Sequence, residues 1–449
     1  MTIALPSPVN AEIRDFADWL PPILVKELRQ GLRARAFVGG FVAVQTAMIV
    51  LLGLRLLDTA AAGQYLPENI DEYQWLVIGF ALLILLPLRG LTAISEETRQ
   101  NTLPLMQLTQ MGSMRLVCGK WLALVSQTLL LVVAILPYQV LTYFFGEVDV
   151  IENIEILGGL LLESLVLTAL CIAFSPANIF VRMVMLGLAF LPVGATVVGF
   201  VEHISNGGGS GFLSSSGPAV SWVVMFVFAA LAAIVFLLAV AAARISHGAE
   251  NAAARIRGIA LAIMAGSMIG ICLGDASQCF VWVILSMPML MWAAMEAMTE
   301  HASGLPSLYV PWVKRGRWGE GLGRIFYPGW GTGVLFVLLM MVLMEVEGGL
   351  IGICSGDKNT DPARFFGIFF QLGMVMLYPG VLLCAMPRLR QRHLVYLGMQ
   401  MSGIAWFVAG SMAGLQRGTG GGALLSFVPP AAFLASMSYS AGDGGWVVA

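Results

Sequence analysis

Charged residues are scarce in this sequence. Asp, Glu, Lys and Arg make up 11% of the 449 residues, whereas hydrophobic residues make up 58% and the mean hydropathy is +0.85. Soluble globular domains carry charge on about a quarter of their residues. The composition therefore excludes a water-soluble enzyme of two or three domains, and the many apolar residues exclude a disordered chain. The net charge of −2 provides no basic field, so no nucleic-acid partner is expected.

Motifs that carry catalysis or hold metals are also missing. The four histidines are scattered without an i, i+4 pair or a carboxylate companion, and the sequence has no CxxC, HExxH or GxSxG motif. The pair Gly119-Lys120 lacks the upstream glycine spacing of a phosphate-binding loop. We therefore expect no catalytic residue, no metal and no cofactor on this chain.

Cysteine is too rare for a disulfide scaffold, with six in the whole chain. Three of them, Cys272, Cys279 and Cys354, fall at turns that the topology given below places outside the membrane. An oxidising compartment there would permit a disulfide among them, and the sequence leaves that question open.

Long apolar runs dominate the sequence. A helix that spans the hydrocarbon core of a bilayer needs roughly 20 mostly apolar residues, and runs almost free of Asp, Glu, Lys and Arg reach that length twelve times. We therefore predict an all-α polytopic membrane protein of about twelve transmembrane helices. Their expected ranges are 36–54, 73–88, 121–146, 156–181, 183–201, 219–243, 258–274, 276–295, 325–344, 365–387, 393–416 and 418–442.

The orientation of these spans follows from their flanking cations, which favour the cytoplasmic side. With both termini in the cytoplasm, all but four of the 24 Lys and Arg residues lie on that side. The cytoplasmic segments would then include 95–120, 243–258 and 299–328. The four exceptions are Arg55, Lys358, Arg364 and Arg417.

An amphipathic segment over 21–36 follows an N-terminal cytoplasmic stretch, 1–20. At 100° per residue, its leucines and valine share one arc, while Lys26, Arg29 and Arg33 share the opposite arc. Such a basic helix before a span is typical of one that lies in the membrane interface. A plain charge cluster that only sets topology is the alternative.

The segment 95–120, between the second and third spans, is neither membrane nor low complexity. Thr102 can cap a short amphipathic helix there. The nearby charges Glu96, Glu97 and Arg99 are expected at the rim of its contact with another protein. The segment fits a compact protrusion that receives another protein, although an ordinary amphipathic connector explains it as well. The apolar residues available for burial are Leu103, Leu105, Met106 and Leu108.

The order I-S-x-E-x-x-x-x-T-L-x-x-x-x-L-T, followed by G-K before the next span, resembles the ABC-2 type permeases. The segment 21–36 resembles the interfacial elbow helix of that family, and the likeness covers roughly 21–245. Asn101, Arg99 and Gln110 depart from the usual family residues. The matching residues are Ile94, Ser95, Glu97, Thr102, Leu103, Thr109, Gly119 and Lys120.

The resemblance implies the permease subunit of an ATP-binding-cassette exporter in the bacterial cytoplasmic (inner) membrane. Segment 95–120 would then carry the helix that docks on a separate ATPase subunit, and a second permease subunit would complete a homo- or heterodimer. The block 246–449, with six further spans, matches no family. The substrate is not readable from the sequence.

Two alternatives remain for the function: a twelve-span secondary transporter and a membrane scaffold that transports nothing. Broken spans related by inverted repeats are typical of secondary transporters, and none is evident here. Glu163 is the only charged residue expected well inside a span. It could serve a substrate or proton pathway, or it could hydrogen-bond within the helix bundle.

Overall fold

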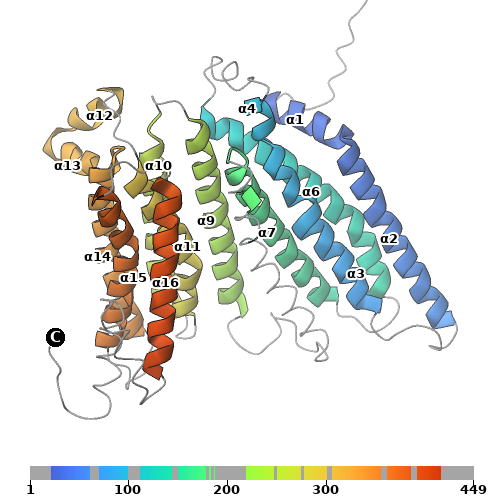
Figure 1. Ribbon diagram of the computed structural model, residues 1–449. Helices are drawn as coiled ribbons and strands as arrows, with labels where there is room; N and C mark the ends of the chain where they lie inside the picture. The colour runs from blue at the N-terminus through green and yellow to red at the C-terminus, as the bar shows by residue number, and fades with distance from the viewer. Residues whose placement is uncertain are drawn as a thin grey trace, which may run out of the picture. The chain divides into compact units, whose positions relative to one another are not determined.

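The computed structural model describes twelve stretches of the chain. Within them every regular element is helical (Figure 1). The chain divides into two compact units, 1–211 and 212–449, and each unit is described by itself. The described residues are 22–60, 70–99, 112–143, 150–177, 182–183, 187, 219–246, 250–274, 278–300, 306–354, 362–385 and 392–415.

Eight helices in the described residues are long and apolar enough to cross a membrane, which confirms a multi-pass membrane protein. Helices α15 (Pro362–Ala385) and α16 (Arg392–Leu415) coincide with two further predicted spans. The predicted spans 183–201 and 418–442 lie almost entirely outside the described residues, so a total of twelve stays a prediction. The eight are Arg35–Leu57, Tyr73–Glu97, Ser113–Tyr143, Asn153–Phe174, Ser221–Ile245, Ala252–Leu273, Cys279–Thr299 and Trp330–Cys354.

Unit 1 is built around helices α2 (Arg35–Ala60), α3 (Ile70–Gly79), α6 (Ser113–Tyr143) and α7 (Val150–Phe174). Their apolar side chains meet in one core. Each helix is apolar nearly all round, as expected for helices that face both lipid and neighbouring helices. The largest fully buried members of this core are Met48, Ile78, Leu82, Leu131 and Ile135.

The second span of unit 1 changes its helical geometry halfway. Helix α3 continues as a π-helical stretch, Phe80–Leu85, and then as a 3-10 stretch, Pro87–Thr92. Pro87 has no N–H to donate, so one hydrogen bond of a regular α-helix is lost there. The loosened backbone is satisfied from α7, because the Ser164 hydroxyl donates to the carbonyl of Leu82 at 2.6 Å. The span then ends in the short helix α4 (Ser95–Arg99).

The amphipathic segment predicted over 21–36 forms helix α1 (Pro22–Arg33), which packs against α6 and α2. Its Lys26, Arg29 and Arg33 side chains are exposed, whereas Ile23 is buried. The amphipathic helix is thus observed, and its location in a membrane interface stays a prediction.

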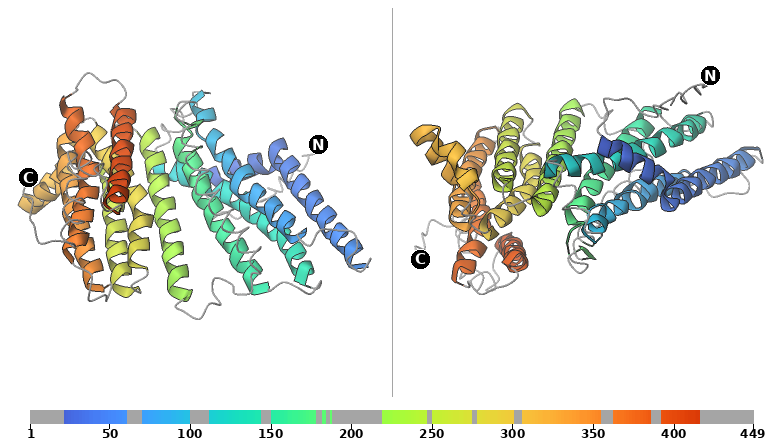
Figure 2. Two further views of the ribbon diagram at one scale, coloured as in Figure 1. Left: turned by 60° about the horizontal axis from the view of Figure 1, so that its bottom comes forward. Right: turned by 90° about the horizontal axis from the view of Figure 1, so that it is seen from above.

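The described residues of unit 2 include six long helices, which run side by side in the views of Figures 1 and 2. They are α9 (Ala219–Ile245), α10 (Ala252–Leu273), α11 (Cys279–Thr299), α14 (Trp330–Cys354), α15 and α16. Two shorter helices, α12 (Pro306–Val313) and α13 (Gly316–Phe326), connect α11 to α14.

Helix α9 packs against α10 and α11 and so belongs to the second compact unit. The sequence instead predicts α9 as the last span of a first six-span block, 21–245. That this block has a function separate from 246–449 stays a prediction. The core of unit 2 is rich in methionine, whose flexible side chain fills irregular gaps between helices. Its fully buried members include Met264, Met340, Met344 and Met376.

The contact between α11 and α14 depends on one glycine. A Cβ atom at Gly333 would lie 1.9 Å from the carbonyl oxygen of Ala297, so α14 approaches the backbone of α11 here. Gly331, two residues earlier, has open space around its Cβ position. Small residues allow close helix contact of this kind.

We expect Gly333→Ala to destabilise the protein by about 1–3 kcal/mol, the usual cost of an overpacked contact. Gly331→Ala is the matched control, because it adds the same methyl group to the same turn without a clash, and helix propensity favours it. Thermal unfolding of the purified full chain in detergent compares the two. Equal midpoints would contradict the close approach of α14 to α11.

Candidate functional site

Lys120 joins three elements of unit 1 at one end of its spans. Its ammonium lies 3.1 Å from a carboxylate oxygen of Glu27 on α1 and 2.8 Å from one of Glu97 on α4. Lys120 lies on α6 just before the predicted span 121–146, and its side chain is 5% exposed. We call Glu27, Glu97 and Lys120 the Lys120 cluster. It fastens α1, α4 and α6 together through buried charge.

Close packing brings α1 to this position. Gly119 precedes Lys120, and a Cβ atom there would lie 2.8 Å from the Cγ2 atom of Ile23 on α1. The missing side chain lets α1 lie directly on α6, which places Glu27 within reach of Lys120. A buried lysine is costly to desolvate and needs such partners.

The end of the second span is held from α7 by Ser175. Its hydroxyl accepts hydrogen bonds from the backbone N–H groups of Ile94 at 2.9 Å and Ser95 at 3.0 Å. The same hydroxyl donates to the carbonyl of Leu91 at 2.8 Å. Ser175 is fully buried. The backbone just before α4 is therefore fixed to the end of α7.

Arg89 adds a second link among these helices. Its guanidinium donates to the side-chain oxygen of Gln127 on α6 and, at 3.4 Å, to the carbonyl of Gly31 on α1. It also lies 5.2 Å from the ring centre of Phe37 on α2. No periodic pattern in the sequence could identify these partners, because the residues lie far apart in the chain.

Two residues of the predicted coupling segment, Glu97 and Lys120, form an ion pair, and Gly119 lies beside Lys120 against Ile23. Glu97 is buried, whereas Glu96 and Arg99 are exposed, and their place at the rim of a contact with an ATPase stays a prediction. The remaining predicted residues lie outside the described part of the chain. They are Thr102, Leu103, Leu105, Met106, Leu108 and Thr109.

Glu163 lies half-buried on α7, and its predicted role in a pathway or in packing stays a prediction. In the structure no disulfide joins Cys272, Cys279 and Cys354, the three cysteines left open by the sequence.

A buried carboxyl that sequence reasoning missed lies within unit 2. Glu347 on α14 is fully buried, and the hydroxyl of Ser267 on α10 lies within hydrogen-bonding distance of it. The sequence predicts a span that ends at 344, before the charged Glu345, but α14 continues to Cys354. The helical spacing of the buried residues Met340, Met344, Glu347 and Ile351 could have revealed the inward face.

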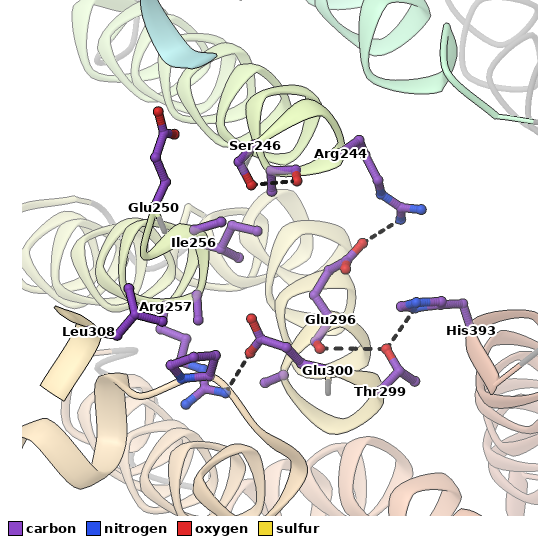
Figure 3. A pocket seen from close by; sticks show the side chains of 15 residues that line it. Arg244, Ser246, Glu250, Ile256, Arg257, Glu296, Thr299, Glu300, Leu308 and His393 are labelled. Carbon is purple, nitrogen blue, oxygen red and sulfur yellow. Dashed lines mark hydrogen bonds and ion pairs between the residues drawn. The ribbon is translucent and has the colours of Figure 1, made fainter. Parts of the chain in front are cut away.

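A pocket of about 300 Å³ opens at one end of unit 2, between the ends of α9 and α11 and the starts of α10 and α16 (Figure 3). Two ion pairs border it: Arg244 lies 2.5 Å from Glu296, and Arg257 lies 3.1 Å from Glu300. On the far side Thr299 lies 2.7 Å from a ring nitrogen of His393. These contacts join the ends of α9, α10 and α16 to the end of α11.

Burial raises the pKa of the Glu300 carboxyl above its ordinary value, and the Arg257 guanidinium and the backbone N–H of Gly329 oppose this rise. Arg257 is 1% exposed and also donates to the carbonyls of Ile325 at 2.6 Å and Tyr327 at 2.8 Å. Among the described residues, no three His, Cys, Asp or Glu side chains come together as a metal site.

Comparison of the chain with protein-family models, curated proteins and solved structures finds no match. The likeness to ABC-2 type permeases therefore rests on the sequence motif and stays a prediction.

Replacing Lys120 should be costly because two carboxylates would stay buried without their cation. We expect Lys120→Met to destabilise the protein by about 3–5 kcal/mol. Lys26→Met is the matched control, since Lys26 is exposed on α1 and its removal should change stability by less than about 0.5 kcal/mol. Thermal unfolding in detergent measures both. If the two variants have the same unfolding midpoint, the Lys120 cluster does not stabilise the fold.

Loss of the Ser267 hydroxyl should leave the Glu347 carboxyl without this hydrogen bond. We expect Ser267→Ala to cost about 1–3 kcal/mol, the usual penalty for an unsatisfied buried group. Ser286 on α11 is also buried, and both hydroxyls lie near the carbonyl three residues earlier on their own helix, Met264 for Ser267 and Val283 for Ser286. The contact with Glu347 on another helix belongs to Ser267, so Ser286→Ala should be nearly neutral. A similar shift of the unfolding midpoint in both variants would argue against the Ser267–Glu347 contact.

Proposed function

We propose that this chain is the membrane-spanning permease subunit of an ATP-binding-cassette transporter, with export as its direction. A separate ATPase subunit would hydrolyse ATP, and a second permease subunit would complete the transport path in the bacterial cytoplasmic membrane. Eight apolar helices of spanning length agree with a membrane subunit. The resemblance of 21–245 to ABC-2 type permeases supplies the family.

The single observation that supports coupling best is the Lys120 cluster. Glu97 lies near the start of segment 95–120 and Lys120 at its end, and they form an ion pair of 2.8 Å. A segment whose two ends are joined and anchored in successive spans can transmit a movement of the ATPase to those spans. A flexible loop would change its own conformation instead. Glu27 extends the connection to α1, so movement of the segment would reach three helices together.

A secondary transporter is the second candidate, and the buried carboxyl of Glu347 favours it. Ionisable residues inside a membrane often mark an ion or proton pathway. This residue lies on α14 of unit 2, where the Ser267 hydroxyl of α10 contacts it. Such a transporter would work without an ATPase, and the experiment below separates the two candidates.

The decisive experiment is purification of the full chain from its native membrane with identification of any bound ATPase subunit. We expect Leu103→Asp combined with Leu108→Asp to abolish co-purification. Two charged side chains would replace the apolar ones that enter a groove on the partner. Membrane insertion should be unchanged. Glu96→Lys is the control, since an exposed rim charge affects association mainly through its rate and salt dependence.

Two results would contradict the proposal. If no ATPase accompanies the unaltered chain, the second candidate gains support. If the double variant keeps the ATPase and transports normally, segment 95–120 is not the coupling element.

A further inference from the structure

Helices α12 and α13 form a hairpin with an exposed apolar face in unit 2. Trp318 is 88% exposed and Leu322 is 52% exposed, and both lie on one side of α13. Val313, at the end of α12, adds a further exposed apolar side chain. The opposite side of α13 carries Arg317 and Arg324. We call the helices α12 and α13 and the turn between them the α12–α13 hairpin.

The hairpin is held as a unit by its own packing. The rings of Trp312 and Phe326 stack with their centres 5.6 Å apart. A Cβ atom at Gly319 would lie 2.4 Å from the carbonyl oxygen of Trp312, so α13 lies directly on the end of α12. The Tyr327 hydroxyl donates to the carbonyl of Tyr309 at 3.1 Å. The exposed face of α13 is therefore a fixed surface.

Arg257 fastens the hairpin to the end of the bundle. This buried side chain donates to the carbonyls at the end of α13, namely those of Ile325 and Tyr327, and pairs with Glu300 beyond α11. Three residues separate α13 from the first residue of α14, Trp330. The hairpin thus stands at the level where α11 ends and α14 begins. Figures 1 and 2 show it projecting sideways from the end of α14.

The charge of the hairpin is strongly positive. It carries four cations and a single acid, Glu320, which lies 3.3 Å from Arg324. Lys314, Arg315 and Arg317 are exposed and have no acidic partner among the described residues. A helix with an exposed tryptophan and leucine on one side and exposed cations on the other is typical of interfacial helices on anionic lipid.

We propose that the α12–α13 hairpin binds the anionic phospholipid headgroups of the membrane that the spans cross. Trp318 and Leu322 enter the boundary between headgroups and acyl chains, and Lys314, Arg315 and Arg317 contact the phosphates. The sideways position at the end of a span favours lipid as the occupant, because lipid surrounds the bundle there. The assignment is independent of whether unit 1 couples to an ATPase.

The test places a photoreactive benzophenone amino acid at position 318 of the full chain. The protein is reconstituted in nanodiscs of equal parts phosphatidylglycerol and phosphatidylcholine, illuminated, and analysed by mass spectrometry. We expect lipid adducts enriched in phosphatidylglycerol. The same amino acid at position 320, on the opposite side of α13, is the matched control and should give several-fold fewer lipid adducts.

The cations are tested by adding Lys314→Gln, Arg315→Gln and Arg317→Gln to the position-318 protein. Each cation near an anionic surface favours binding by roughly fivefold, so the enrichment in phosphatidylglycerol should disappear while lipid adducts remain. Equal adducts of both lipids in the unaltered hairpin would overturn the headgroup assignment. Absence of lipid adducts, or adducts to another protein in native membranes, would overturn the lipid as occupant.

Discussion

The backbone hydrogen bond is the constraint on which the rest of this structure depends. In a bilayer no water satisfies exposed N–H and C=O groups, so a spanning chain must satisfy them internally. The described residues meet this demand with helices alone. Where the helical geometry changes, a side chain makes a hydrogen bond to the backbone. Ser164 donates to the carbonyl of Leu82 within the π-helical stretch, and Ser175 accepts from the backbone just before α4. At the end of α13, Arg257 does the same for two carbonyls.

At the helix ends of both units, buried charges occur as ion pairs, whereas the buried Glu347 within α14 contacts the Ser267 hydroxyl. Lys120 holds two carboxylates in unit 1, and Arg257 holds Glu300 in unit 2. Such pairs are weak contributors to net stability, yet breaking one leaves a charge without compensation. Their main effect is to fix which helix ends stay together. In unit 1 that set includes both ends of the proposed coupling segment.

The sequence predicted the spans well because hydrocarbon thickness imposes a minimum length of apolar chain. Eight predicted ranges correspond to helices that the structure describes as long enough to cross. Helix α1 was also predictable from its two-sided pattern. The partners of Lys120 and Arg89 were not, since they depend on how helices pack. Glu347 was missed because a charge looks the same in a sequence whether it ends a helix or lies buried inside one.

Helix α6 is longer than the membrane it would cross. Its 31 residues measure about 46 Å at 1.5 Å per residue, against a hydrocarbon core of about 30 Å. If the excess lies at the Ser113 end, roughly 16 Å would stand outside the bilayer as a rod that begins at Ser113. If that rod pivots where it enters the bilayer, a sideways step at Ser113 would be about twice as large at the opposite surface. Helix length alone would then give α6 a mechanical gain, with Lys120 on the short arm of the rod.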